Sequence, residues 1–337
     1  MQFFPVLVVG FAAALGLTPV SREIAMRIGV VDKPNKRKIH LDNKPLMGGL
    51  AIYLAFAISL ILFSPPQHFV QMGAVLAGGA FVAFVGFLDD RYNLGIRIRL
   101  IAAGLAGTVA VIAGISFQFT GIAWIDYPLT VFWIMAITNA VNFLDNMDGL
   151  AAGLAAIAAF FFLVIAVGQG LHLVSLLAAA LLGSAVGFLI YNFAPSSTFM
   201  GDMGALMLGF VLSVLGVKLD MVTPPLNPTW MIPLLVLILP VFDINLVIFT
   251  RLSEGRSPGE AGKDHTSHRL LSLGLSHRQT LFLLYGGCTF FGLVAVGLSA
   301  TTPQLGWVIA AIMIVLVAAL YGVMIWIRER IQKRPTV

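Results

Sequence analysis

The chain has 337 residues, of which 59% are hydrophobic and only 10% are charged, and its formal net charge is +5. A soluble globular domain carries about 25% charged residues, so this composition excludes that class and indicates a multi-span membrane protein. The single cysteine, Cys288, excludes an internal disulfide and any metal cluster built from cysteines.

Apolar runs of roughly 16–22 residues follow one another along the chain, and each is long enough to cross a hydrocarbon core of about 30 Å as a helix. They show no alternating pattern of the kind found in membrane β-barrels. Hydropathy and chain breakers therefore predict an all-α polytopic membrane protein with about eleven transmembrane helices in one domain, residues 1–337. The expected spans are 3–20, 47–63, 70–88, 100–117, 128–141, 150–168, 173–191, 204–218, 230–250, 281–299 and 306–327. The first run lacks a basic region before it, which favours a retained span over a cleaved signal peptide.

Basic residues orient this expected bundle. One face holds 19 of the 20 lysines and arginines, and the opposite face holds only Lys218. The positive-inside rule makes the basic face cytoplasmic, with the N-terminus outside and the C-terminus inside. Most carboxylates and four of the six histidines share that face. An active site is therefore expected in the cytoplasmic loops and the helix ends behind them.

Two adjacent carboxylates, Asp89 and Asp90, end the third expected span in the motif GFLDDRYNLGIRIR. Like charges this close raise each other's pKa unless a cation compensates. Arg91, Arg97 and Arg99 could supply that charge or hold an anionic substrate. The alternative is a solvated helix end followed by a basic loop that only orients the protein.

The stretch NAVNFLDNMDGL, residues 139–150, carries Asn139, Asn142, Asp145 and Asp148 at every third position. A stride of three turns each successive side chain back by about 60° on an ideal helix, so the four do not share one face. We expect the helix to end before Gly149. Capping explains one or two such residues, but five within ten positions favour a function.

Two further polar motifs lie on the same expected face. In YNFAPSSTFMGDMGALMLGF, residues 191–210, Asp202 lies between two glycines at the expected start of a span. Glycines let a ligand approach the backbone, although an ordinary aspartate N-cap is the alternative. In GKDHTSHRLLSLGLSHRQ, residues 262–279, His265, His268 and Arg269 accompany Lys263. Histidines at i and i+3 can ligate a metal, but the cationic neighbours favour phosphate binding. A plain surface loop is the alternative.

Two other features have structural explanations. The basic loop 31–49, which includes His40, is accounted for by the positive-inside rule and by anionic lipid headgroups. Asp243 lies within the ninth expected span. An intramembrane carboxylate indicates a functional site by default. It could equally pair with a cation of a loop and hold the site together.

These clusters together predict a transfer reaction at the membrane surface. Hard oxygen ligands suit Mg²⁺, which usually keeps waters and bridges to substrate phosphates. Basic loops suit a diphosphate. A cytoplasmic site with both predicts transfer of a phosphoryl-linked group from a soluble nucleotide to a membrane lipid.

The motifs FLDD, NAVNFLDNMDGLAAG, YNFAPSSTFMGD and KDHTSHRLLSLGLS resemble those of the polyprenyl-phosphate N-acetylhexosamine-1-phosphate transferases, distant relatives of the phospho-muramyl-pentapeptide transferases. The resemblance runs from the basic loop 31–49 to about His277. It implies that a UDP-sugar, most simply UDP-N-acetylglucosamine, reacts with undecaprenyl phosphate at the inner membrane and releases UMP. Lipid-linked envelope glycans such as lipopolysaccharide or teichoic acid would start there.

The resemblance also implies a role for each matching residue. Asp89 and Asp90 would be catalytic beside the lipid phosphate, and Asp202 and Asn142 would hold Mg²⁺, with Mn²⁺ as the alternative ion. The expected nucleotide-binding residues are Asp145, Asn146, Met147, Asp148, Asn192 and Phe199, and the expected diphosphate-binding residues are His265, His268 and Arg269. We expect membrane lipid and a second copy of the chain as partners, and no nucleic acid.

One position departs from the family pattern, because Ser267 stands where its basic loop usually has a middle histidine. This leaves another UDP-N-acetylhexosamine or UDP-muramyl-pentapeptide as alternative donors. An ion-coupled transporter is the alternative of another class, but a transporter should carry polar groups near the bilayer midplane. Here only Asp243 lies that deep. A CDP-alcohol phosphotransferase is disfavoured because its dense aspartate signature is missing.

Overall fold

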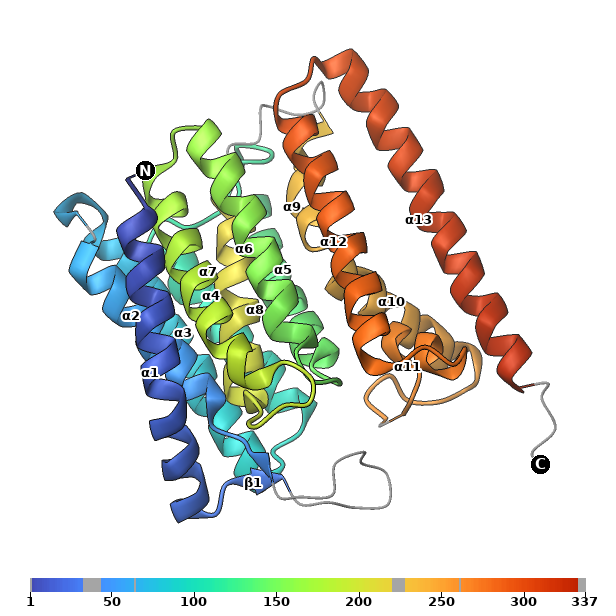
Figure 1. The fold of residues 1–337 in the computed structure, drawn as a ribbon. Coiled ribbons are helices and arrows are strands. Elements are labelled where there is room, and N and C mark those ends of the chain that lie inside the picture. The colour runs from blue at the N-terminus through green and yellow to red at the C-terminus, as the bar shows by residue number, and fades with distance from the viewer. Residues whose placement is uncertain (1, 33–43, 64, 220–227, 261, 333–337) are drawn as a thin grey trace. The chain divides into compact units, whose positions relative to one another are not determined.

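The computed structural model describes residues 2–32, 44–63, 65–219, 228–260 and 262–332 (Figure 1). The chain forms two compact units, residues 1–220 and 221–337. Most of the basic loop 31–49, with His40, lies outside the described residues, as does Asp220.

The described part of unit 1 is a helical bundle with one short antiparallel ribbon. The ribbon pairs β1 (Val31–Asp32) with β2 (Lys44–Pro45), in the register Val31 opposite Pro45. The helices are α1 (Phe4–Ile28), α2 (Gly48–Phe63), α3 (Phe69–Tyr92), α4 (Ile96–Ile112), α5 (Ala123–Leu144), α6 (Leu150–Gly168), α7 (His172–Asn192) and α8 (Gly201–Val217), with a 3-10 turn at Pro66–His68.

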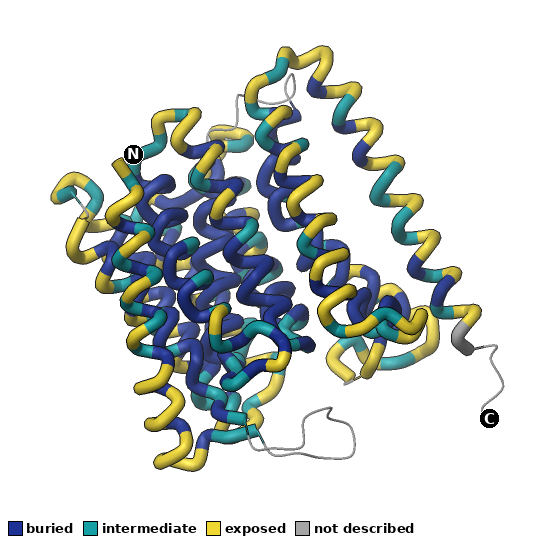
Figure 2. The backbone as a smooth tube through the Cα atoms, viewed as in Figure 1, coloured by how far each residue is buried: buried dark blue, intermediate teal, exposed yellow. Residues whose placement is uncertain are grey.

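Helix α8 lies at the centre of unit 1, where it contacts α2, α3, α4, α5, α6 and α7. Every residue of α8 except Asp202 is buried. A helix that is apolar on all sides lies in a protein core or spans a membrane, and here other helices surround it. Outer helices such as α1 instead alternate buried and exposed positions (Figure 2). The packing therefore fixes α8, and with it Asp202, against six neighbouring helices.

Close packing between α1 and α7 depends on small residues. A Cβ atom at Gly183 of α7 would lie 2.2 Å from the Leu7 carbonyl oxygen, and one at Gly187 would lie 2.5 Å from the Phe11 carbonyl oxygen. Small residues spaced by four let two membrane helices approach closely where apolar burial alone gives little drive. The N-terminus of α1 lies at one end of unit 1 and the ribbon at the other (Figure 1).

Unit 2 comprises α9 (Met231–Val236), α10 (Ile238–Ser253), α11 (Thr266–Ser272), α12 (His277–Ser299) and α13 (Pro303–Gln332), after a 3-10 turn at Pro228–Trp230. The sequence predicts one span over 230–250, but the chain bends by 80° between α9 and α10. Proline explains this difference. Pro240 has no N–H to donate to the Val236 carbonyl, so the helical hydrogen-bond ladder is interrupted there.

Each of the eleven expected spans corresponds to a helix of the structure, with the span at 230–250 divided between α9 and α10. Seven helices of the described residues are long and apolar enough to cross a membrane, or eight when the bent pair counts as one span. Helices α2 and α8 are apolar but shorter. The fold is therefore that of an all-α multi-pass membrane protein, while eleven crossings and their orientation stay predictions.

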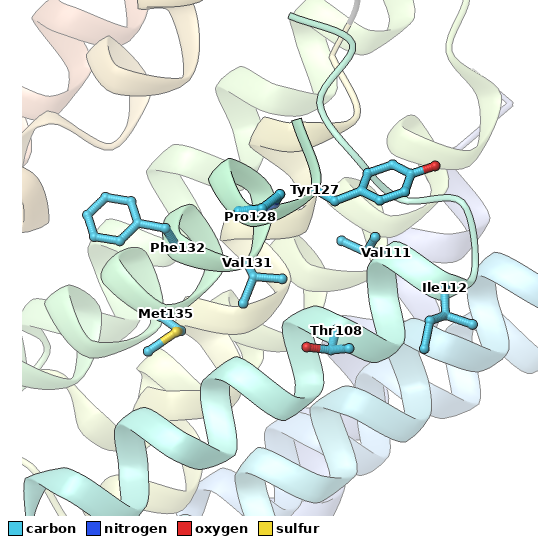
Figure 3. A pocket seen from close by; sticks show the side chains of 8 residues that line it. All are labelled: Thr108, Val111, Ile112, Tyr127, Pro128, Val131, Phe132 and Met135. Carbon is cyan, nitrogen blue, oxygen red and sulfur yellow. The ribbon is translucent and has the colours of Figure 1, made fainter. Parts of the chain in front are cut away.

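An apolar groove lies between α4 and α5 in unit 1 (Figure 3). Its wall combines Val111 and Ile112 of α4 with Val131, Phe132 and Met135 of α5. Thr108, the polar residue on the α4 side, donates its hydroxyl to the Gly104 carbonyl of its own helix at 2.9 Å. The groove offers aliphatic contact of the kind a lipid chain makes, and Tyr127 is the titratable residue in its lining.

Replacing Gly183 by alanine tests the packing of α1 on α7. We expect Gly183→Ala to lower the free energy of unfolding by about 1–3 kcal/mol, because the new methyl group overpacks the contact. Gly16→Ala on α1 is the matched control, since a Cβ there meets nothing within 4 Å. Thermal unfolding in detergent compares them, and equal stability of the two variants would contradict the close packing.

Candidate active site

The carboxylate of Asp90 anchors the start of α8. Asp90, near the end of α3, accepts the Asp202 N–H at 2.9 Å and the Met203 N–H at 3.3 Å. A carboxylate at a helix N-terminus satisfies unpaired N–H groups and offsets the positive end of the helix dipole. Gly201 must be glycine here, because its φ is 70° and a Cβ would lie 2.4 Å from the Asp90 carboxylate. Asp90 therefore fixes the backbone that carries Asp202.

A single guanidinium joins two further carboxylates. Nη1 of Arg99, in the first turn of α4, lies 2.8 Å from Asp89 Oδ2 and 2.8 Å from Asp202 Oδ2. Asn142 donates its amide to Asp202 Oδ1 at 2.8 Å. The turn before α4 supports this arrangement, since the Gly95 N–H donates to Asp89 Oδ1 at 3.1 Å. Four expected site residues from three helices, Asp89, Asp90, Asn142 and Asp202, therefore meet in one polar cluster.

The segment after α5 leaves the helix as the sequence predicts. Helix α5 ends at Leu144, and Gly149 has a left-handed φ of 77° before α6 begins. Asp148 accepts the Ser196 N–H at 2.9 Å. Asn192 accepts the Gly149 N–H at 3.1 Å and donates to the Thr198 carbonyl at 3.0 Å. Asp148 and Asn192 thus connect the loop after α5 to the loop before α8.

The other residues expected at the nucleotide occupy these same two loops. Asn146 donates to the Phe143 carbonyl at 3.4 Å, and Met147 is buried. Phe199 lies next to the ribbon, where its N–H donates to the Pro45 carbonyl at 2.9 Å and its carbonyl accepts the Gly48 N–H at 3.0 Å. The structure therefore brings these residues near one end of unit 1, and their contact with a nucleotide stays a prediction.

The pKa of Asp145, in the loop after α5, is raised. Burial raises the pKa of Asp145 to about 7, and the negative charges of Asp202 and Asp148 add to the effect. Asp145 therefore holds its proton up to about pH 7.

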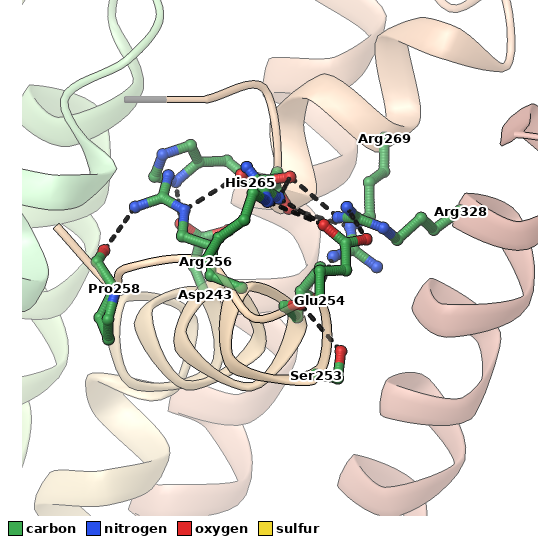
Figure 4. Close-up of polar contacts among 11 residues, drawn as sticks. Asp243, Ser253, Glu254, Arg256, Pro258, His265, Arg269 and Arg328 are labelled. Carbon is green, nitrogen blue, oxygen red and sulfur yellow. Dashed lines mark hydrogen bonds and ion pairs between the residues drawn. The ribbon is translucent and has the colours of Figure 1, made fainter. Parts of the chain in front are cut away.

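In unit 2, Asp243 organises the start of α11 (Figure 4). Its Oδ2 lies 2.7 Å from His265 Nδ1, and its Oδ1 accepts the Thr266 N–H at 2.6 Å. Because a carboxylate only accepts hydrogen bonds, this contact places an N–H of His265 at Nδ1. Asp243 is 1% exposed. Of the two roles left open by the sequence, the geometry matches the structural one, with a histidine as the loop partner.

The loop between α10 and α11 is held by a second carboxylate, Asp264. It accepts Arg251 Nε at 3.0 Å, Arg256 Nη2 at 2.9 Å and Arg328 Nη1 at 2.8 Å. Burial alone would raise the pKa of Asp264, but the three guanidinium hydrogen bonds outweigh it and hold the pKa well below its usual range. Glu254 pairs with two of these arginines, Arg256 and Arg328 (Figure 4).

Arg269 and His268 have different surroundings, because each guanidinium nitrogen of Arg269 donates a hydrogen bond and His268 has a lowered pKa. Arg269 is 3% exposed and donates to the Asp264 carbonyl, the Met324 carbonyl and the Thr250 hydroxyl at 2.7–2.9 Å. Burial and Arg328 lower the pKa of Arg269 to about 10, so it stays charged at neutral pH. Burial, His265 and Lys263 lower the pKa of His268 to about 4. His268 is therefore neutral and available as a hydrogen-bonding group, and diphosphate binding by these residues stays a prediction.

The contact between Asp202 and Asn142 is the candidate position for a divalent metal in unit 1. Within the described residues, no three His, Cys, Asp or Glu side chains come together as a complete metal cage. Asp202 and Asn142 offer one carboxylate and one carboxamide in direct contact. Mg²⁺ is usually held by one or two carboxylates together with waters and substrate phosphates. The donor set therefore fits an ion that a phosphate substrate helps to hold.

The structure also identifies residues whose importance the sequence left undecided. Arg91, Arg97 and Arg99 are equivalent candidates from sequence, and the turn at Asn93–Gly95 selects Arg99. Asp264 and Arg251 were not expected at a site at all. An acidic residue within a basic loop is the signal that could have identified Asp264.

Asp145 should make stability depend on pH. The folded state keeps a proton on Asp145 up to about pH 7, whereas the unfolded chain loses it near the ordinary value of 3.8. Stability therefore falls as the pH rises between these values. Without divalent metal, Asp145→Asn should unfold at a higher temperature than wild type at about pH 8, and the difference should shrink toward about pH 4. A pH-independent difference in thermal unfolding would contradict the raised pKa.

Asp243 should contribute more to stability than a solvated polar residue does. Asp243→Ala leaves the His265 and Thr266 donors buried without an acceptor, so we expect a loss of about 2–4 kcal/mol in unfolding free energy. Asp243→Asn keeps one acceptor oxygen and should lose less. Asn245→Ala on the exposed face of α10 is the control, expected within about 0.5 kcal/mol of wild type. Thermal unfolding measures all three, and equal losses for Asp243→Ala and Asn245→Ala would be inconsistent with the anchoring role.

Comparison with known proteins places these features in a family. Residues 72–220 match the model of glycosyl transferase family 4. The chain is 35% identical over 91% of its length to a protein of Bacillus subtilis (strain 168), described as a probable undecaprenyl-phosphate N-acetylglucosaminyl 1-phosphate transferase, and covers 88% of it. It is 30% identical over 83% of its length to the decaprenyl-phosphate N-acetylglucosaminephosphotransferase of Mycolicibacterium smegmatis, covering 77% of that protein. It is 27% identical over 93% of its length to the undecaprenyl-phosphate alpha-N-acetylglucosaminyl 1-phosphate transferase of Yersinia pestis, covering 88% of it. The chain belongs to the family of polyprenyl-phosphate N-acetylhexosamine-1-phosphate transferases.

Proposed function

We propose that this protein transfers N-acetylglucosamine-1-phosphate from UDP-N-acetylglucosamine to undecaprenyl phosphate at the cytoplasmic face of the inner membrane. The observation that carries the proposal is the convergence of Asp89, Asp90, Asn142 and Asp202 at the start of α8. The relatives support the sugar and the acceptor, because their names specify N-acetylglucosamine and polyprenyl phosphates. They are transferases, which favours this reaction over an ion-coupled transporter.

The proposed chemistry is a phosphoryl transfer between two phosphates. An oxygen of the lipid phosphate attacks the sugar-linked phosphorus of the donor, and the bond from that phosphorus to the oxygen of UMP breaks. A proton on the attacking phosphate passes to Asp89 or Asp90, and UMP leaves with the bond's electron pair. In such reactions the protein mainly positions the reactants and compensates charge.

The residues of unit 1 suit these tasks. Asp202 and Asn142 would hold Mg²⁺, which neutralises charge on the donor diphosphate when it is bound. Asp90 keeps Asp202 in place through the backbone of α8. The loop residues Asp145 to Asp148, with Asn192 and Phe199, would surround the uridine. In unit 2, His265, His268 and Arg269 would contribute to donor diphosphate binding. We also propose that the protein forms a homodimer in the membrane.

An assay of UMP release tests the proposed function. Purified protein with Mg²⁺, UDP-N-acetylglucosamine and undecaprenyl phosphate should release UMP, and omission of Mg²⁺ should abolish the release. Asp202→Ala and Asp90→Asn should each abolish UMP release while the protein stays folded. Asp202→Ala removes a proposed metal ligand, and Asp90→Asn weakens the anchor of α8. Wild-type turnover in both variants would refute the mechanism.

The same assay with a panel of donors tests the sugar. UDP-N-acetylglucosamine should be the best substrate, ahead of other UDP-N-acetylhexosamines and UDP-muramyl-pentapeptide. A preference for another donor would leave the reaction class intact and change the substrate assignment.

A further inference from the structure

Among the described residues, Arg99 is the one cation that contacts both Asp89 and Asp202, and the proposed chemistry assigns it no role. Its Nη1 contacts Asp89 and Asp202 at the same distance of 2.8 Å. Its side chain is 18% exposed, and its Nε is buried without a hydrogen-bond partner in the described structure. The guanidinium is therefore held through one corner only.

A permanent structural arginine in this chain is bonded differently. Arg269 uses Nε, Nη1 and Nη2, each with its own acceptor. An arginine that pairs permanently with a carboxylate also commonly uses two parallel N–H bonds. Arg99 has neither arrangement. Its geometry is that of a cation placed between two negative groups without being locked to either.

We infer that Arg99 is the resident counter-cation of Asp89 and Asp202, and that a divalent metal ion displaces it from Asp202. The inference rests on the proposed function, in which Asp202 and Asn142 hold the ion. Two carboxylates that share one contact atom repel each other strongly unless a cation lies between them. Without bound metal, Arg99 supplies this charge and preserves the geometry of the cluster.

Competition follows from the atoms involved. Both oxygens of Asp202 are already occupied, one by Arg99 and the other by the Asn142 amide. Each of these oxygens has a second lone pair, but a divalent ion on Oδ2 would stand next to the guanidinium charge, and this repulsion drives Arg99 off that oxygen. Arg99 also donates to Asp89 Oδ2 at 2.8 Å, and we expect it to keep this contact in the exchange. Metal binding at Asp202 thereby changes the environment of Asp89 through one side chain.

Binding of Mn²⁺ to the substrate-free protein tests the inference. Free Mn²⁺ is measured by electron paramagnetic resonance during titration of detergent-solubilised full-length protein. We expect Arg99→Gln to bind Mn²⁺ at least about fivefold more tightly than wild type, the low end of typical coupling between two sites. Arg97→Gln is the matched control, because it removes the same charge from an exposed position of the same turn. We expect its affinity to stay within about twofold of wild type, since exposed charges are screened.

Two more variants separate the possible failures. Asp202→Asn should abolish the Mn²⁺ site. If it binds like wild type, the ion is held elsewhere, and both the proposed metal site and the inference fail. If Asp202→Asn loses binding but Arg99→Gln binds no more tightly than wild type or Arg97→Gln, only the inference is overturned.

Thermal unfolding checks that each variant is folded. Arg99→Met, which keeps the aliphatic stem, replaces Arg99→Gln with the same expectation if that variant unfolds.

Discussion

Two backbone N–H groups at the start of α8 donate to the carboxylate of Asp90, and the polar cluster of unit 1 is arranged around this contact. It requires α3 to approach α8 so closely that a Cβ at Gly86 would lie 2.5 Å from the Asp202 carbonyl carbon. Gly201 is needed for the same reason. Because the backbone is fixed in this way, the Asp202 side chain is positioned to contact Arg99 and Asn142. A carboxylate that looks catalytic in the sequence is therefore also the element that sets the geometry.

Unit 2 uses the same device independently. The buried Asp243 accepts the first N–H of α11 and the imidazole of His265, as Asp90 accepts two N–H groups of α8. A carboxylate buried in a membrane protein is costly unless hydrogen bonds satisfy it. Main-chain donors at a helix start supply those bonds in a fixed direction. In both units the residue expected to meet the substrate therefore belongs to a segment held by an aspartate of another helix.

The sequence predicts the elements of this structure better than their internal contacts. Apolar runs locate the helices, and the stride of Asn139 to Asp148 correctly places a helix end before Gly149. The bend before α10 is not predicted, because hydropathy averaged over a span does not register the missing N–H of Pro240. The choice of Arg99 among three arginines depends on a turn with left-handed Asn93 and Gly95, which composition does not reveal. The burial of Arg269 depends on partners as distant in sequence as Met324, so no local sequence pattern predicts it.

The charge balance of unit 1 constrains how a diphosphate could enter it. Asp89, Asp90, Asp145, Asp148 and Asp202 gather around a cluster in which Arg99 pairs with two of them, and burial together with the charges of Asp202 and Asp148 raises the pKa of Asp145. A free diphosphate would be repelled by such a cluster, because its own charge has the same sign. A diphosphate that arrives with a divalent ion brings the missing positive charge. On the proposed function, the acidic residues therefore select a metal–nucleotide complex over the bare nucleotide, and Arg99 maintains the cluster between turnovers.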